Sequence, residues 1–356
     1  MRHLLPRIVW TLFLSTALLA PAKVESWTDT QGNTFKGEPS EVLGPIALFR
    51  TSSNGGRRLP WRVLSPADCV RFHEALAKKP ARADDWTKAT GALTFDLLNR
   101  VKQRQNGELV KATLGGRPEP LVLVAFFVDN SEGKSWELLG KSGGPFQELA
   151  QKHPGLIEGI QLGLNHSKDE HQNMALSMNV PWLLVDFYEQ GKIQLLKDFS
   201  PPKGEFSLVV FSRNGVPIFS ANNPSETDIQ KLFVDLGALL DLQRPTNART
   251  WADRAHYLTA LQPVLHPKDA AGPVLLGDPI MPQGLRDRKI YRVEAKIDVA
   301  ADGKVAKATV KEDATLPAPI AAALGDALQK AAVFVPAVDH GKLVASTYDY
   351  LLEIPR

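Results

Sequence analysis

Apolar and polar residues change their spacing repeatedly through the middle of the chain. Residues 121–128 and 156–164 form unbroken apolar runs, which are typical of strands buried on both faces. Two further strands, at residues 206–212 and 216–219, are joined by an Asn-Gly turn. Helices are expected at residues 146–152, 167–178, 190–196 and 226–240. This alternation predicts a mixed sheet in an α/β layer fold over residues 89–242.

Short stretches rich in strand-forming residues precede this region. They cover residues 34–43, 46–51 and 57–63, with turn signals between them. A helix is expected next, because Ser65 suits the N-cap, Pro66 the first helical position and Asp68 the third. Strands that close on one short helix predict a small all-β barrel over residues 24–79.

The C-terminal part alternates between apolar and polar positions. Residues 290–299 alternate strictly, and residues 306–310 do so again after an Asp-Gly turn. An alanine-rich helix is expected at residues 319–332, and a long final strand at residues 343–354. After an irregular lead-in at residues 266–284, this order predicts an α+β domain of the β-β-α-β type within residues 254–356.

The N-terminal residues have the pattern of an export signal. Arg2 and Arg7 precede an apolar run at residues 8–19, which is shorter than the roughly 20 residues of a membrane-spanning helix. Ala-Pro-Ala at residues 20–22 then suits cleavage, so residues 1–22 are predicted to be a secretory signal peptide. An uncleaved anchor is the alternative. Cleavage would leave a periplasmic or secreted protein with no membrane span in the mature chain.

Composition narrows the class of protein. The chain has 356 residues, 44% hydrophobic and 23% charged, as in a folded soluble protein of about two or three domains. Its formal net charge is +3, and no basic cluster is dense enough to indicate a nucleic-acid partner. Cys69 is the single cysteine, so the chain has no internal disulfide. We expect a buried, unreactive thiol; an intermolecular bridge is the alternative.

The first region resembles the Sla-type homology domain, an SH3-like barrel. The resemblance rests on SWTDTQGNTFKGEPSEV, IALFRT, NGGRRLPW and LSPADCVRF. It implies a domain that binds peptides or other domains and has no catalytic group. Trp27 and Trp61 are candidates for an aromatic recognition face, with core packing as the alternative for at least one of them.

The order β-α-β-α-β-β-α in the central region is the thioredoxin plan. The segments MNVPWLLVDF and FSLVVFSRNGVPIF resemble the nucleoredoxin/tryparedoxin branch of that family. Members carry Cys-x-x-Cys after the first central strand, and matching strand to strand puts this pair at Glu132 and Ser135. The family's cis-proline falls near Phe206. Because neither glutamate nor an unactivated serine performs thiol exchange, these positions are interpreted as vestigial and no catalytic residue is predicted.

The C-terminal region resembles the C-terminal domain of TonB-type energy transducers. The resemblance rests on AKIDVAADGKVAKATV, the alanine-rich helix and VFVPAVDHGKLV. The chain lacks an anchor followed by a long proline-rich spacer, so the resemblance implies a reused protein-binding fold and not energy transfer.

Two clusters of polar residues are candidates for ligand sites. His166, Glu170 and His171 suggest a metal site. His166 and Glu170 share a helical face, but His171 points off it, so a third converging ligand is missing. Ser167 and Glu170 also fit a helix-capping box. The loop with Glu132 and Ser135 suggests an anion site, with a solvated loop as the alternative. We therefore predict no metal and no cofactor.

These patterns predict an exported, non-enzymatic adaptor with a protein or peptide partner in the cell envelope and a redox-inactive thioredoxin-like domain. The alternative is a thiol-redox-associated or chaperone-like thioredoxin-family protein with a retained binding cleft. A third hypothesis is an envelope scaffold whose last strand, residues 343–354, pairs with a strand of a partner.

Overall fold

The computed structural model describes residues 24–51, 55–128, 144–164, 167–177, 180–197, 199, 206–243, 251–277, 290–312 and 316–353. The expected signal peptide lies outside these residues. No helix in the described part of the chain is long and apolar enough to cross a membrane.

The N-terminal module is an antiparallel sheet packed against a helix. Its elements are β1 (Glu25–Thr28), β2 (Thr34–Leu43), β3 (Ile46–Arg50), β4 (Gly56–Pro60), the 3-10 turn η1 (Trp61–Val63) and the helix α1 (Pro66–Ala77), and the strands pair in chain order. The Ser65 hydroxyl accepts a hydrogen bond from the Asp68 N–H at 3.1 Å, which confirms the predicted N-cap of α1.

The central module is built on a mixed sheet with the strand order β11-β10-β7-β8-β9-β5-β6 in the described residues. The strands are β5 (Val101–Gln105), β6 (Glu108–Lys111), β7 (Val122–Val128), β8 (Ile157–Gly163), β9 (Leu183–Val185), β10 (Ser207–Ser212) and β11 (Pro217–Asn222). β7 pairs in parallel with β8 and β8 with β9, whereas β10 is antiparallel to β7. The predicted mixed sheet is confirmed. The β5–β6 hairpin was not expected, because its largely polar residues give no strand signal.

Helices cover both faces of this sheet. They are α2 (Ala92–Leu97), a helical segment at residues 144–152, α4 (Lys168–Ser177), α5 (Gln194–Lys197) and α6 (Glu226–Asp241), with 3-10 turns η2 (Trp86–Lys88) and η3 (Gln190–Lys192). Successive residues of β7 point to opposite faces, so Phe126 packs in the core that contains α6 while Phe127 packs in the core that contains α2. The order β-α-β-α-β-β-α, with β9 and α5 preceding β10, is the thioredoxin-like plan expected from the sequence.

The N-terminal and central modules share one hydrophobic core. Leu43 and Leu48 of the N-terminal sheet belong to the same buried cluster as Val216 and Ile218 at β11. Gly56 in β4 lies so close to β11 that an added Cβ would stand 2.2 Å from the carbonyl oxygen of Pro217. The two modules are therefore packed as one body and are not joined by the connecting segment alone.

The C-terminal module contains small antiparallel sheets and the helix α8 (Ala318–Ala331), one face of which packs in the core with them. The strands are β12 (Ala270–Ala271), β13 (Val274–Leu275), β14 (Arg292–Val299), β15 (Val305–Val310), β16 (Phe334–Val335), β17 (Ala337–Asp339), β18 (Lys342–Val344) and β19 (Ser346–Glu353). The predicted β-β-α-β order is present as β14, β15, α8 and β19.

Two details of this module differ from the prediction. The lead-in at residues 266–284 is not wholly irregular, because β12 pairs with β17 and β13 pairs with β16. The single final strand expected at residues 343–354 is divided into β18 and β19. The division has a physical reason: β18 folds back on β17 through a turn at His340 (φ 47°) and Gly341 (φ 74°), while β19 pairs with β14.

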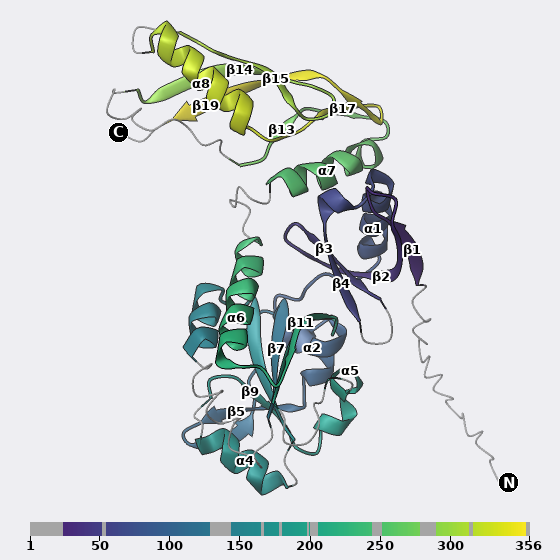
Figure 1. Ribbon diagram of the computed structural model, residues 1–356, viewed down its shortest axis with the longest axis vertical. Coiled ribbons are helices and arrows are strands. Elements are labelled where there is room, and N and C mark those ends of the chain that lie inside the picture. Colours follow the sequence, from purple (N-terminus) through teal and green to yellow (C-terminus); the bar gives the residue numbers. More distant parts are fainter. Residues whose placement is uncertain are drawn as a thin grey trace, which may run out of the picture.

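The helix α7 (Trp251–Leu265) was not predicted. It lies between the N-terminal and C-terminal modules (Figure 1) and contacts α1 and η1 of the first and β16, β17 and β18 of the second. Its Tyr257 ring stacks on Trp61, with ring centroids 4.0 Å apart. Because α7 has neighbours on different sides, its apolar residues do not form one stripe, and the helical period is hidden in the sequence.

Candidate functional site

The sequence predicts vestigial redox positions at Glu132, Ser135 and near Phe206. Glu132 and Ser135 are outside the described residues. Phe206 directly precedes β10, and with 2% of its surface exposed it belongs to the core shared with α6. The position at which the sequence matching placed the family's cis-proline is thus a buried aromatic residue.

Cys69 lies in the core of the N-terminal module. Its side chain is fully buried, and its sulfur is 3.9 Å from the carbonyl oxygen of Trp61. Burial, with a smaller contribution from the charge of Asp68, raises the pKa of the Cys69 thiol to about 12. Since the thiolate is the reactive form, this cysteine is unreactive at neutral pH. The prediction of a buried cysteine is confirmed.

The aromatic recognition face expected at Trp27 and Trp61 is not formed by these residues. Trp27 is 0% and Trp61 1% exposed. Their ring N–H groups donate to backbone carbonyls within the module, that of Gly37 at 2.8 Å and that of Gly44 at 3.4 Å. The rings pack around Phe72, because a small sheet needs large aromatic side chains to fill its core.

Of the residues considered as a metal cluster, Glu170 and His171 do not converge in the structure. His166 lies outside the described residues, and Glu170 is exposed on α4. His171 is fully buried, and its Nε2 donates to the carbonyl oxygen of Val185 at 3.0 Å. Burial lowers the pKa of His171, so the ring is neutral at pH 7. The Ser167 hydroxyl accepts a hydrogen bond from the Glu170 N–H at 3.2 Å, as predicted for the cap of α4.

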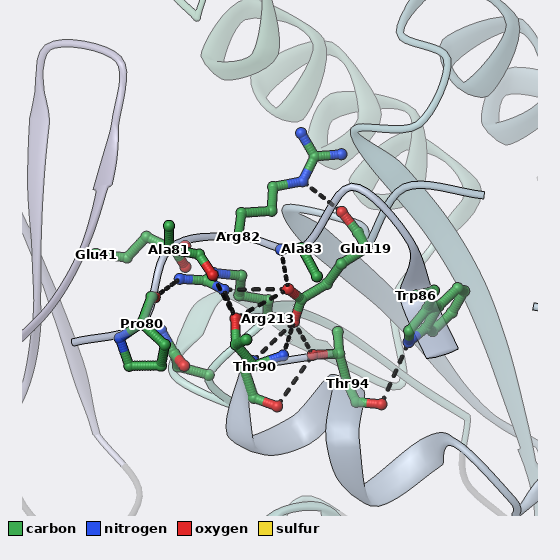
Figure 2. A network of polar contacts seen from close by, with 12 residues as sticks. Glu41, Pro80, Ala81, Arg82, Ala83, Trp86, Thr90, Thr94, Glu119 and Arg213 are labelled. Carbon is green, nitrogen blue, oxygen red and sulfur yellow. Dashed lines mark hydrogen bonds and ion pairs between the residues drawn. The ribbon is translucent and has the colours of Figure 1, made fainter. Parts of the chain in front are cut away.

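A buried cluster of charged side chains joins the N-terminal module to the central module. Glu119 is 0% exposed and accepts hydrogen bonds from the N–H groups of Ala83 at 2.9 Å and Gly91 at 2.7 Å, and from the hydroxyl of Thr94 (Figure 2). Arg213 Nη1 lies 3.1 Å from Glu119 Oε2. The carboxylate is thereby surrounded by donors.

Arg213 extends this cluster across the module boundary. It lies in the turn between β10 and β11, and its Nε donates to Glu41 Oε1 of β2 at 2.5 Å. Its Nη2 donates to the carbonyl oxygen of Pro80, in the connecting segment, at 3.1 Å. One guanidinium group therefore holds three segments of the chain, and we call Glu41, Glu119 and Arg213 the module clasp.

The two carboxyl groups of the module clasp titrate differently. Burial raises the pKa of Glu41 to about 7, although the charge of Arg213 opposes the shift. Burial also acts to raise the pKa of Glu119, but the hydrogen bonds from Ala83 and Thr94 and the charge of Arg213 outweigh it and hold that pKa below the ordinary value. Glu41 Oε2 is buried and has no hydrogen-bond partner within the described residues. Glu119 thus stays ionised, while Glu41 exchanges its proton near neutral pH.

The strand β19 is one of the edge strands of the described structure and is a candidate surface for meeting another protein. β19 is the last strand in the order β15-β14-β19, and in the described residues it pairs with β14 on one side and with no strand on the other (Figure 1). A free strand edge presents backbone donors and acceptors that a second strand can use.

The register shows which residues face this free edge. The Lys311 N–H donates to the Glu294 carbonyl oxygen at 2.8 Å, so the backbone polar groups of Glu294 point toward β15. Those of Val293 then point toward β19, where Val293 lies opposite Leu352. The alternate residues of β19 direct their N–H and C=O groups outward: Thr347, Asp349, Leu351 and Glu353.

Comparisons with known proteins give a limited result. No family model matches the chain, and no curated protein matches it. Among solved structures, it is similar to a thioredoxin from Wuchereria bancrofti (19% identity, TM-score 0.29, covering 40% of this chain and 97% of that one). It is also similar to tryparedoxin II from C. fasciculata (14% identity, TM-score 0.30, covering 39% of this chain and 88% of that one). A third similar structure is peroxiredoxin Q from Xanthomonas campestris (17% identity, TM-score 0.27, covering 36% of this chain and 85% of that one). Similarities of this size carry no argument about function.

Sequence reasoning missed the module clasp entirely. Glu41 and Arg213 are 172 residues apart, and each stands in a stretch that reads as an ordinary polar strand end or turn. No local pattern links them. For the last strand, in contrast, the sequence had led to the hypothesis of pairing with a strand of a partner.

Proposed function

We propose that this chain is an exported, non-enzymatic adaptor that binds a protein or peptide partner in the cell envelope by strand addition to β19. The observation that carries the proposal is the outward row of backbone groups at Thr347, Asp349, Leu351 and Glu353. Extended peptides bind sheet edges in this way, because main-chain hydrogen bonds supply affinity and alternate side chains supply specificity.

The arrangement of the modules supports this role. The shared core and the module clasp make the N-terminal and central modules one body. The helix α7 then carries the C-terminal module, whose strand β19 has one edge without a strand partner among the described residues. A stiff body that presents an unpaired strand edge is suited to holding a partner in a fixed position.

The finer assignments are part of the same proposal. Residues 24–79 are proposed to be a Sla-type, SH3-like domain, supported by the bridge between Asp29 and Leu64 that returns the chain after β4 to β1. Residues 89–242 are proposed to be a thioredoxin-like domain without redox activity, and residues 254–356 a TonB C-terminal-like domain. Glutamate and serine at the redox positions, and the raised pKa of Cys69, support the absence of thiol chemistry.

Strand addition is tested by removing one outward N–H group. In Leu351→Pro the full chain loses that donor, whereas Leu351→Ala keeps it and serves as the matched control. Immobilised wild type, both variants and a blank support are compared for the envelope proteins they capture. We expect specific proteins to bind wild type and Leu351→Ala and to be lost with Leu351→Pro. Equal capture by Leu351→Pro, with an unchanged circular dichroism spectrum, contradicts the proposal.

A disulfide-reduction assay separates the adaptor from the redox-associated alternative. We expect no turnover of insulin disulfides by the wild type in the presence of dithiothreitol beyond that of dithiothreitol itself. Turnover that Cys69→Ser abolishes would favour the alternative and contradict a non-enzymatic role.

A further inference from the structure

The side chains that accompany the free edge of β19 are acidic and apolar. Asp349, Leu351 and Glu353 are exposed, and Leu351 keeps 51% of its surface accessible although it is a large apolar residue. They lie on the face of the sheet opposite α8, because Tyr350 and Leu352 between them pack in the core with that helix. Any strand added to β19 places its own alternate side chains beside these three.

The two carboxylates at this edge are not neutralised within the described residues. On the neighbouring strand, Glu294 forms ion pairs with Arg292 at 2.7 Å and with Lys311 at 3.1 Å. Asp349 and Glu353 form no ion pair with any described residue, although Asp349 stands opposite Lys296 in the register. Arg292 and Lys311 are thus paired with Glu294, while Asp349 and Glu353 remain available at the edge.

A hollow on the same face continues from the edge into the sheet. It has a volume of about 740 Å³, and its lining includes Lys296, Lys311, Asp349 and Leu351. The exposed Leu351 side chain therefore lies between two carboxylates and beside this hollow.

We propose that the partner strand accepted by β19 carries the pattern basic-x-apolar-x-basic. This inference rests on the proposed strand addition and names the chemistry of its partner. The two basic side chains lie across from Asp349 and Glu353, and the apolar side chain lies across from Leu351. Opposite charges and apolar groups in directly opposed positions stabilise strand pairs, while like charges destabilise them. The pattern reads the same in both chain directions, so it holds for parallel and antiparallel addition.

A second copy of this chain fits the edge less well. Its own β19 offers Thr347, Asp349, Leu351 and Glu353 at the outward positions and no basic residue. Pairing centred on Leu351 would set Asp349 opposite Glu353 twice, which is repulsive. A partner of opposite charge pattern is therefore favoured over self-association.

The test uses fluorescence anisotropy with the full chain and two labelled peptides of equal length. Both contain Thr and Val at the intervening positions and one central Leu; one has Lys at the two outer positions and the other has Glu. We expect the Lys peptide to bind at least tenfold more tightly than the Glu peptide. The double variant Asp349→Lys/Glu353→Lys is expected to reverse the order, and Leu351→Pro to abolish both. The matched control is Asp326→Lys/Glu312→Lys, which changes the same net charge at two exposed carboxylates away from the edge.

The outcomes separate this inference from the proposed function. Equal binding of the two peptides, or reversal by the control variant as well, overturns the charge pattern but leaves strand addition in place if Leu351→Pro still abolishes binding. Binding that survives Leu351→Pro, with the fold intact by circular dichroism, overturns strand addition itself. Absence of binding by both peptides overturns the pattern. If sedimentation velocity shows a dimer of the wild type and the variant Leu351→Pro is monomeric, the edge of β19 binds a second copy of the chain and the pattern is likewise overturned.

Discussion

Arg213 Nε and Glu41 Oε1 lie 2.5 Å apart across the boundary between the central and N-terminal modules. Both side chains are at least nine-tenths buried, so this pair is shielded from solvent and salt. Its counterpart on the other side, Glu119, is fully buried and satisfied by backbone donors. The stability of the two-module body therefore depends on a small number of charged groups.

Removal of Arg213 should lower the stability of the body formed by the N-terminal and central modules. Arg213→Ala leaves Glu41 and Glu119 buried without their cation, and breaking a buried pair in this way costs about 3–5 kcal/mol. We expect a loss of that order in the free energy of unfolding, measured by urea denaturation. The exposed Arg104→Ala is the control and should change stability by no more than about 0.5 kcal/mol. An effect of Arg213→Ala as small as that of the control would show that the clasp does not hold the modules.

Glu41 should lower the free energy of unfolding as pH rises, which is the opposite of the effect of a carboxyl group whose pKa is lowered by folding. Its pKa is about 7 in the folded chain and near its ordinary value of 4.5 when unfolded. Below pH 4.5 both states hold the proton; between pH 4.5 and 7 the folded state alone holds it, so the contribution of this group falls as pH rises. Above pH 7 the loss is complete.

Glu41→Gln tests this dependence, because glutamine keeps the hydrogen bond to Arg213 but does not titrate. We expect the stability of Glu41→Gln relative to wild type to improve by about 2–3 kcal/mol between pH 4.5 and 7.5 and to stay constant above that. The measurement is chemical denaturation of both proteins across the pH series. A difference between the two that does not change with pH would place the folded pKa of Glu41 near 4.5.

Cys69 should be modified only when the N-terminal module opens. A thiol with a pKa of about 12 in a closed core offers almost no thiolate at pH 8. We expect no reaction with a chromogenic disulfide reagent in the native protein, and one equivalent of reaction in denaturant. A native reaction at pH 8 that is as fast as the reaction in denaturant would contradict the buried position, and a disulfide-linked dimer on a non-reducing gel would favour the intermolecular bridge.

Tyr257 should govern how α7 docks on the N-terminal module. Its ring stacks on Trp61 and its hydroxyl lies 2.8 Å from His73 Nδ1. Tyr257→Phe keeps the stacking and loses the hydrogen bond, at a cost of about 1 kcal/mol, whereas Tyr257→Ala also removes the ring and costs roughly 2 kcal/mol or more. Hydrogen exchange along residues 251–265 should speed up strongly in Tyr257→Ala and little in Tyr257→Phe. Equal protection in both variants would show that α7 is held by other contacts.

Local sequence patterns located most elements of the fold. Leu121 through Val128 reads as a buried strand because it packs on both faces, and Ser65 and Ser167 read as helix caps because each places an oxygen near a free backbone N–H. The β5–β6 hairpin and α7 could not be found in this way. The first is polar and lies at a sheet edge, and the second distributes its apolar residues among neighbours in two modules.

The burial of individual side chains was decided at longer range. The sequence around Trp27 and Trp61 does not show whether these side chains face solvent or a core. Their burial depends on packing against Phe72 of α1 and, for Trp61, Tyr257 of α7, which come later in the chain. The division of the last strand into β18 and β19 likewise depends on which strands are available to pair with each half.

The sequence by itself determined the periods of the strands and helices, their caps and turns, and the absence of a Cys-x-x-Cys pair, because each of these is encoded within a few neighbouring residues. Only the tertiary structure decided that the first two modules share a core, that Glu41 meets Arg213, and that β19 keeps a free edge. These relationships join residues far apart in the chain, and nothing in the local spacing of a charged residue or a strand records which distant surface it will meet.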